Sequence, residues 1–229
     1  MFPIGDTDIR PRRTAFITIA LVVINTIIFI YEFTLSQPAL DSLFSQYAVI
    51  PTNILAGNHL LTLFTSMFLH GGWLHLIGNM LFLWVFGDNV EAVLGHIGYL
   101  IFYLIGGIVA SLSHVLMNST STLPSLGASG AIAAVLGAYI VMFPRSQVRV
   151  LIFYGIGFWV TRVTAIFFLG IWIITQLFNG FASLGVPTSQ TSGVAVWAHV
   201  GGFVLGFIIG LVFRGRAQNL QYRAGDYST

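Results

Sequence analysis

The chain has 229 residues, of which 56% are hydrophobic and only 7% are charged. Soluble domains carry about 25% charged residues, so a chain this apolar has too little polar surface to cover itself in water. The composition therefore excludes an ordinary soluble protein and indicates that most of the chain lies in a lipid bilayer. The net charge of +2 does not argue for a nucleic-acid partner, and the absence of cysteine excludes disulfides, thiolate metal sites and a cysteine nucleophile.

Six apolar segments are candidates for spanning helices, each of which needs about 20 residues. We expect these helices at 15–35, 73–94, 97–117, 126–143, 163–184 and 194–213. A further apolar segment, 148–161, has only about two thirds of the length of a span, and we interpret it as lying at the membrane surface. The expected fold class is thus an all-α integral membrane protein with six transmembrane helices.

The basic residues support this topology because they gather in three segments: before the first span, between the fourth and fifth spans, and after the last. They are Arg10, Arg12, Arg13, Arg145, Arg149, Arg162, Arg214, Arg216 and Arg223. With six spans, these three segments face the same side, which the positive-inside rule makes the cytoplasm. The loops on the other side, 36–72, 118–125 and 185–193, contain no Lys or Arg.

This topology predicts a multi-pass protein of the cell membrane with both termini in the cytoplasm. The expected organisation is a cytoplasmic N-terminal tail at 1–14, a membrane domain at 15–213 and a cytoplasmic C-terminal tail at 214–229.

Four polar side chains share one depth in the predicted bundle. Ser129 opens the fourth span, His75 and Asn79 lie in the first turns of the second, and His199 lies near the start of the sixth. All three helices run inward from the outer side, so at about 1.5 Å rise per residue all four groups lie in the outer third of the bilayer. Polar side chains are costly at such depth, which indicates a functional site.

Ser129 and His199 are a candidate nucleophile and base. Gly127 and Gly130 flank the serine and permit a sharp turn and a close substrate approach. Gly202 begins a row of small residues after His199, and small residues let membrane helices pack closely. Such contact would place the imidazole beside the hydroxyl, which needs a base because it is a weak nucleophile. Taken singly, the serine also fits a helix cap and the histidine a hydrogen bond between helices.

A third, acidic member of a catalytic triad is not evident. Asp88 and Glu91 fall at the inner end of the second span, whereas Glu32 lies near the outer edge of the first and Asp41 in the following loop. The sequence therefore favours a Ser-His dyad over a Ser-His-Asp triad. In a dyad, His199 has to be oriented by packing.

His75 and Asn79 are four residues apart and therefore share one face of a helix. Both can donate hydrogen bonds, so together with the backbone N–H of Ser129 they are candidates for an oxyanion hole. Asn79 alone also fits a role in helix packing. His75 with His70 and His199 is an alternative metal site, but no carboxylate shares their depth. We expect neither a metal nor a cofactor.

Together these motifs resemble the rhomboid family of intramembrane serine proteases, from about residue 60 to residue 210. The matching signatures are HGGWLHLIGN at 70–79, GDNVE at 87–91, GASG at 127–130 and AHVGG at 198–202. Their order, spacing and placement on the expected helices all agree with the family. Many members also carry a Trp-Arg pair shortly before the first signature, where this chain has Leu61-Thr62.

The resemblance implies a rhomboid-like bundle in which Ser129 attacks the scissile carbonyl and His199 takes its proton. It also implies that His75 and Asn79 help to bind the oxyanion, and that Glu91 has a structural role near the end of its helix. The implied reaction is hydrolysis of a peptide bond in the transmembrane segment of another membrane protein. Single-span substrates with an unstable outer segment are expected, because an intact helix shields its peptide bonds.

The family also implies that substrate enters sideways past the fifth span, at 163–184. Phe167, Phe168 and Trp172 of this span fit either a gate or lipid contact. Two other functions remain as alternatives. An inactive rhomboid-like protein that binds membrane helices for quality control would usually lack the serine or the histidine, and both are present. A small transporter would need acidic residues in the centres of its spans, where they are nearly absent.

Overall fold

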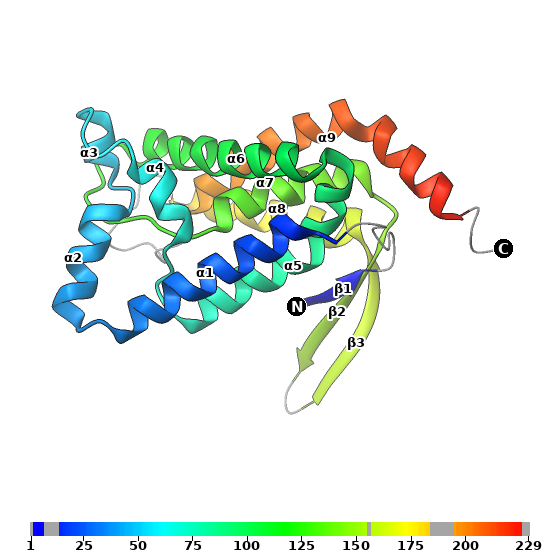
Figure 1. The fold of residues 1–229 in the computed structure, drawn as a ribbon, viewed down its shortest axis with the longest axis horizontal. Helices are drawn as coiled ribbons and strands as arrows, with labels where there is room; N and C mark the ends of the chain where they lie inside the picture. The colour runs from blue at the N-terminus through cyan, green and yellow to red at the C-terminus, as the bar shows by residue number, and fades with distance from the viewer. Residues whose placement is uncertain (1, 7–13, 155–156, 184–194, 226–229) are drawn as a thin grey trace.

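A computed structural model describes residues 2–6, 14–154, 157–183 and 195–225, and its main feature is a bundle of helices (Figure 1). The six principal helices are α1 Phe16–Thr34, α5 Trp73–Leu94, α6 His96–Met117, α7 Ser129–Met142, α8 Ala165–Ser183 and α9 Val196–Gly225. Five of them are long and apolar enough to cross a membrane, and α7 is a shorter apolar helix. The helical membrane fold expected from the sequence is confirmed.

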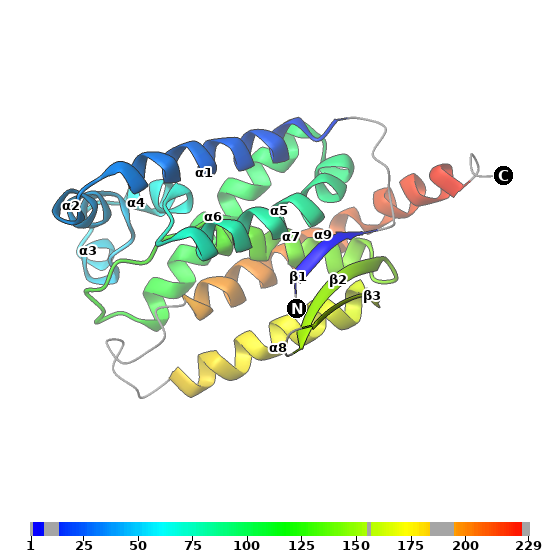
Figure 2. The ribbon, with the colours of Figure 1, turned by 90° about the horizontal axis from the view of Figure 1, so that it is seen from below.

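The helices begin and end within a few residues of the predicted bounds, with one exception at the end of the chain. There α9 continues to Gly225, well beyond the predicted end of the sixth span at 213. The start of α1 and the end of α9 lie at the same end of the bundle (Figures 1 and 2). The predicted loop 185–193 and the arginines at 10, 12 and 13 lie outside the described residues.

The short helix α7 lies in the middle of the bundle, where it contacts α5, α6, α8 and α9 (Figure 2). It is rich in Ala and Gly, and nearly all of its side chains are buried. A β-carbon on Gly206 of α9 would overlap the carbonyl oxygen of Ala134 in α7, and one on Gly137 would overlap that of Phe203. The two backbones therefore touch directly, which only small residues allow.

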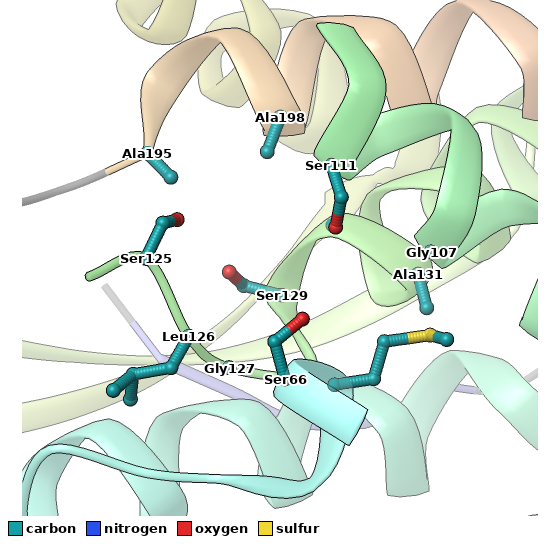
Figure 3. Close-up of a pocket in the computed structure, with 12 residues that line it drawn as sticks. Ser66, Gly107, Ser111, Ser125, Leu126, Gly127, Ser129, Ala131, Ala195 and Ala198 are labelled. Carbon is teal, nitrogen blue, oxygen red and sulfur yellow. The ribbon is translucent and has the colours of Figure 1, made fainter. Parts of the chain in front are cut away.

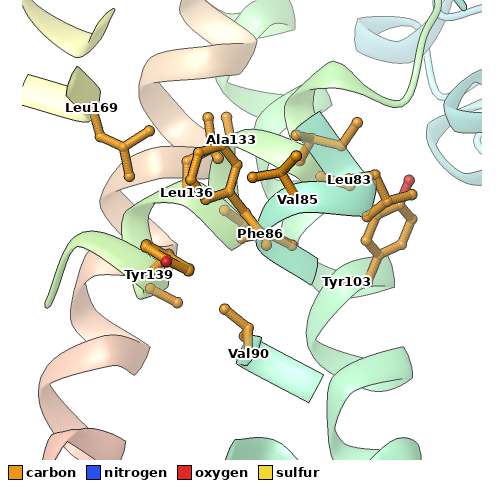
Figure 4. Close-up of a cluster of buried hydrophobic side chains, with 14 of the residues drawn as sticks. Leu83, Val85, Phe86, Val90, Tyr103, Ala133, Leu136, Tyr139 and Leu169 are labelled. Atoms are coloured by element: carbon orange, nitrogen blue, oxygen red, sulfur yellow. The ribbon is translucent and has the colours of Figure 1, made fainter. Parts of the chain in front are cut away.

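Larger side chains fill the half of the bundle nearer the start of α1, between α5, α6, α7 and α8 (Figure 4). Phe86 of α5 packs edge-on against Tyr139 of α7, with ring centroids 4.9 Å apart. The outward faces of the long helices instead expose large apolar side chains such as Ile27 and Phe178. Exposed apolar surface of this extent fits contact with lipid rather than with water.

The loop 36–72 forms four short helices, which lie at the end of the bundle opposite the start of α1 and the end of α9 (Figure 1). They are α2 Gln37–Tyr47, α3 Pro51–Leu55, α4 Thr62–Thr65 and the 3₁₀ helix η1 Ser66–Phe68. At the position of the family's Trp-Arg pair, Leu61 is exposed, whereas Thr62 is buried and its hydroxyl donates to the carbonyl of His59.

A three-stranded antiparallel sheet projects from the end of the bundle where α1 begins (Figure 1), and the all-helical expectation did not include it. Its strands are β1 Phe2–Asp6, β2 Gln147–Tyr154 and β3 Gly157–Thr164, in the order β1-β2-β3. The segment 148–161 thus forms most of a hairpin, in which Arg149 pairs with Arg162. Val148 and Val150 are buried whereas Arg149 is exposed, the period of two that a half-buried strand requires.

Candidate active site

The structure brings Ser129 and His199 together at the end of the α7–α9 contact where both helices begin. Ser129 is the first residue of α7, and His199 lies in the first turn of α9. The Nε2 atom of His199 is 2.8 Å from the Oγ atom of Ser129. This distance depends on glycine, because a β-carbon on Gly202 would overlap the carbonyl oxygen of Gly130 and push the helices apart.

The second ring nitrogen of His199 has a partner that the sequence did not reveal. Its Nδ1 atom lies 2.8 Å from the Oε1 atom of Gln176 in α8. One turn earlier on α8, the ring of Trp172 lies 5.7 Å from the imidazole, measured between centroids. The sequence carried one signal for Gln176: it is an amide near the centre of a largely apolar span, four residues after Trp172 on the same helical face.

His75 and Asn79 border Gly127, two residues before Ser129. The Nε2 atom of His75 lies 2.7 Å, and the Nδ2 atom of Asn79 lies 3.7 Å, from the place where a β-carbon of Gly127 would be. Gly127 also has a φ of +125°, which side-chain-bearing residues rarely adopt, and its N–H donates to the carbonyl of Ser66. Glycine is therefore required at 127 both by conformation and by space.

Both side chains can donate hydrogen bonds into this region. The Nδ2 atom of Asn79 is buried and has no hydrogen-bond partner among the described residues, which is unusual for a buried donor. The backbone N–H of Gly71 makes a long hydrogen bond of 3.4 Å to Nδ1 of His75. An acceptor role for Nδ1 leaves the proton on Nε2, the atom that faces Gly127.

His70 lies behind His75 and is almost completely buried, with the two rings edge to face and their centroids 5.1 Å apart. Its backbone N–H donates to the Oε2 atom of Glu32 in α1. Burial lowers the pKa of the His70 imidazole to about 4, and the neighbouring His75 contributes in the same direction. His70 is therefore neutral at neutral pH and does not repel His75.

A metal centre formed by His70, His75 and His199 finds no support in this geometry. Both nitrogens of His199 are already in hydrogen bonds, to Ser129 and to Gln176. Within the described part of the chain, no group of three histidine or acidic side chains is arranged to hold a metal ion.

Residues 57–216 match the family model of the Rhomboid domain, which covers most of the bundle and all the residues of the site. The chain belongs to the rhomboid family. It is 32% identical to RHOMBOID-like protein 5 of Arabidopsis thaliana, over 68% of this chain and 45% of that protein. It is also 32% identical to Rhomboid protease GluP of Bacillus subtilis, over 67% of this chain and 31% of the relative.

A mitochondrial relative matches as well. Presenilin-associated rhomboid-like protein A of Danio rerio is 32% identical over 53% of this chain and 32% of its own length. The rhomboid domain described here thus spans less than half the length of each of these three relatives.

Glu91 of the rhomboid domain lies at the far end of α5 from His75 and holds three helices together. Its Oε1 atom accepts the N–H of Ile17, and its Oε2 atom accepts both the N–H and the hydroxyl of Thr18. Its carboxylate is also 2.6 Å from Nδ1 of His96 at the start of α6. A carboxylate at a helix N-terminus satisfies free N–H groups and complements the helix dipole, so Glu91 fixes the start of α1.

A small cavity of about 20 Å³ adjoins Ser129 (Figure 3). Its polar lining comes from the hydroxyl groups of Ser66, Ser111, Ser125 and Ser129. A polar cavity of this size holds about one water molecule, but it has no room for a peptide segment.

The three aromatic residues of α8 that the sequence singled out lie in three different environments. Phe167 is exposed, as lipid contact requires, whereas Phe168 is buried and stacks on Phe86 of α5. Trp172 packs on His199. Phe168 and Trp172 thus have contacts that would break if α8 moved outward, as does Phe181 farther along α8, which packs edge-on against Trp197 of α9. A gate formed by α8 stays a prediction.

Proposed function

We propose that this chain is an intramembrane serine endopeptidase that hydrolyses peptide bonds in transmembrane segments of other membrane proteins. The observation that carries the proposal is the 2.8 Å contact between Nε2 of His199 and Oγ of Ser129. A serine hydroxyl and an imidazole at hydrogen-bonding distance are the minimum needed for nucleophilic catalysis by serine. The similarity to a relative named Rhomboid protease GluP supports the same reaction class.

In this mechanism the Oγ atom of Ser129 attacks the scissile carbonyl carbon while its proton passes to Nε2 of His199. The negative charge that develops on the carbonyl oxygen is bound by N–H donors, for which the Ser129 backbone, His75 and Asn79 are the candidates. The unpartnered Nδ2 of Asn79 supports this role, because a buried donor without a partner gains most from a new acceptor.

The tetrahedral intermediate then collapses, and the leaving amine takes the proton from Nε2 of His199. A water molecule next gives its proton to Nε2 and attacks the ester formed with Ser129. The second tetrahedral intermediate collapses by breaking its bond to Oγ of Ser129 and releases the new carboxyl terminus of the substrate. The Oγ atom takes the proton back from Nε2 of His199, so the enzyme returns to its starting state. The serine-lined cavity beside Ser129 has the size and polarity to hold such a water molecule.

The proposal includes the topology inferred from the arginines. The membrane domain 15–213 would be flanked by the tails 1–14 and 214–229 in the cytoplasm, in the cell membrane. The site would then open toward the outer face, and single-span membrane proteins would be its substrates. Reporter fusions after Asn118 should read as external and fusions after Gly225 as cytoplasmic.

Cleavage of a single-span substrate in proteoliposomes tests this function directly. The purified chain should cut the substrate within the outer part of its span, and the Ser129→Ala variant, shown to be folded, should not. Equal cleavage by both proteins would contradict the proposal. If neither protein cleaves and both bind the substrate helix, the alternative of an inactive, helix-binding rhomboid-like protein is favoured.

A further inference from the structure

We propose that Gln176 is a positioning residue for His199, and this proposal rests on the proposed function. Its side-chain carbonyl accepts the Nδ1 proton of the imidazole, and this keeps Nε2 free to take the proton of Ser129. The two distances that carry the inference are equal, 2.8 Å from Nδ1 to Oε1 of Gln176 and 2.8 Å from Nε2 to Oγ of Ser129. Gln176 of α8, His199 of α9 and Ser129 of α7 thus form a chain of two hydrogen bonds across three helices.

The chemistry of imidazole explains why the partner matters. Neutral histidine carries one proton, and it acts as a base through Nε2 only when that proton is on Nδ1. His199 is buried, so an Nδ1–H without an acceptor would be costly, and the ring would favour the other tautomer or turn away. In the other tautomer, Nε2 carries the proton and cannot accept one from Ser129.

The acceptor observed at Nδ1 is the amide of Gln176, whereas the buried acidic side chains Glu32 and Glu91 have other partners. Glu32 binds the N–H of His70, and Glu91 binds the start of α1 at the far end of the bundle. An amide oxygen also suits the location, since a neutral group is less costly at membrane depth than a carboxylate. A neutral acceptor selects the tautomer, although it stabilises the imidazolium less than an aspartate would.

Trp172 completes the positioning from the same helix. Its ring packs on the imidazole and also on Phe203, with centroids 6.2 Å apart in the second pair. Trp172 and Gln176 are one turn apart on α8 and therefore point in the same direction. The indole limits where the ring of His199 can lie, and the amide determines its rotation and its proton.

The first test compares three variants in the full chain. Gln176→Met keeps the length and volume of the side chain but has no comparable acceptor. Gln176→Glu keeps an acceptor oxygen. Thr175→Val is the matched control, because Thr175 is the preceding residue, is exposed, and donates only to the carbonyl of Trp172 in its own helix.

We expect Gln176→Met to lower kcat about tenfold with KM unchanged, which corresponds to the loss of one neutral hydrogen bond in a buried site. The rate at which a fluorophosphonate labels Ser129 should fall by the same factor. Gln176→Glu should retain most of the activity, and Thr175→Val should equal the original chain. A Gln176→Met variant that is folded and fully active would overturn the inference, as would equal losses in the Met and Glu variants.

The second test does not depend on activity. Nitrogen NMR of histidine-labelled protein, with the His199 signals assigned by their loss in His199→Ala, reports which ring nitrogen carries the proton. We expect the proton on Nδ1 in the original chain, and a proton on Nε2 there would overturn the inference even if Gln176→Met fails to fold. Absent labelling of Ser129 in the original chain would count against the proposed function, whereas the NMR result judges Gln176 independently.

Discussion

Two of the neighbours of α9, namely α7 and α8, hold it in different ways. Against α7 the contact is backbone to backbone, since a β-carbon on Gly202 or Gly206 would overlap a carbonyl oxygen of that helix. Against α8 the contacts at the site are made by the side chains of Gln176 and Trp172, and a β-carbon on Gly180 of α8 would meet side chains of α9 rather than its backbone. The Ser129–His199 distance is thus fixed by rigid packing, whereas the orientation of the imidazole depends on groups that can adjust.

The largest loss of activity should come from removing Ser129 of α7 or His199 of α9, the two groups that react across the rigid contact between these helices. Ser129→Ala and His199→Ala should each lower kcat by about 10⁶-fold, as such changes do in a soluble serine protease. The double variant should be no worse than either single variant, because the two groups act as a unit. Substrate cleavage by folded, purified variants measures this, and additive losses would show that the two residues act separately.

A smaller effect is expected for Asn79→Ala, because Asn79 is one of several candidate donors to the oxyanion and is not a reacting group. Loss of one oxyanion donor costs about 10²–10³-fold in kcat in soluble serine proteases, and His75 and the backbone should compensate in part. The loss should therefore lie within or below that range, with KM little changed. An unaltered kcat in a well-folded variant would remove Asn79 from the site.

A pair of glycine variants tests the backbone contact between α7 and α9 directly. Gly206→Ala should destabilise the fold by about 1–3 kcal/mol, the usual cost of overpacking, because the new methyl group meets the backbone of α7. Unfolding in mixed micelles followed by circular dichroism measures the difference.

Gly170→Ala is the matched control and should give the smallest effect. The β-carbon has open space there, and alanine is the better helix former by about 1 kcal/mol, so stability should be unchanged or slightly higher. If both variants lose the same stability, the close backbone contact at Gly206 does not account for the loss, and the tight packing of α9 on α7 is wrong.

The helices were predictable because apolar runs of about 20 residues have few other stable arrangements in a membrane. The sheet was harder to predict. Segment 148–161 is too short to span and is rich in β-branched and aromatic residues, but its pairing with Phe2–Asp6 joins segments far apart in the chain. Sequence composition carries no information about such a long-range pairing.

The candidate site was predictable to the extent that it follows motifs. Gly127, Ser129 and His199 lie in short patterns of small residues around a polar one, and helix direction gave them a common depth. Gln176 follows no motif, and its role depends on the rotation of α8 about its axis. Neither the apolar periodicity nor the charges of the chain determine that rotation.

The most direct test of the central claim is covalent labelling of the purified chain by a fluorophosphonate, with the modified residue identified by mass spectrometry. If Ser129 is activated by His199, one adduct should form per chain at Ser129, and its rate should fall strongly in His199→Ala. A folded chain in which Ser129 stays unlabelled, or is labelled equally fast without His199, would contradict the account.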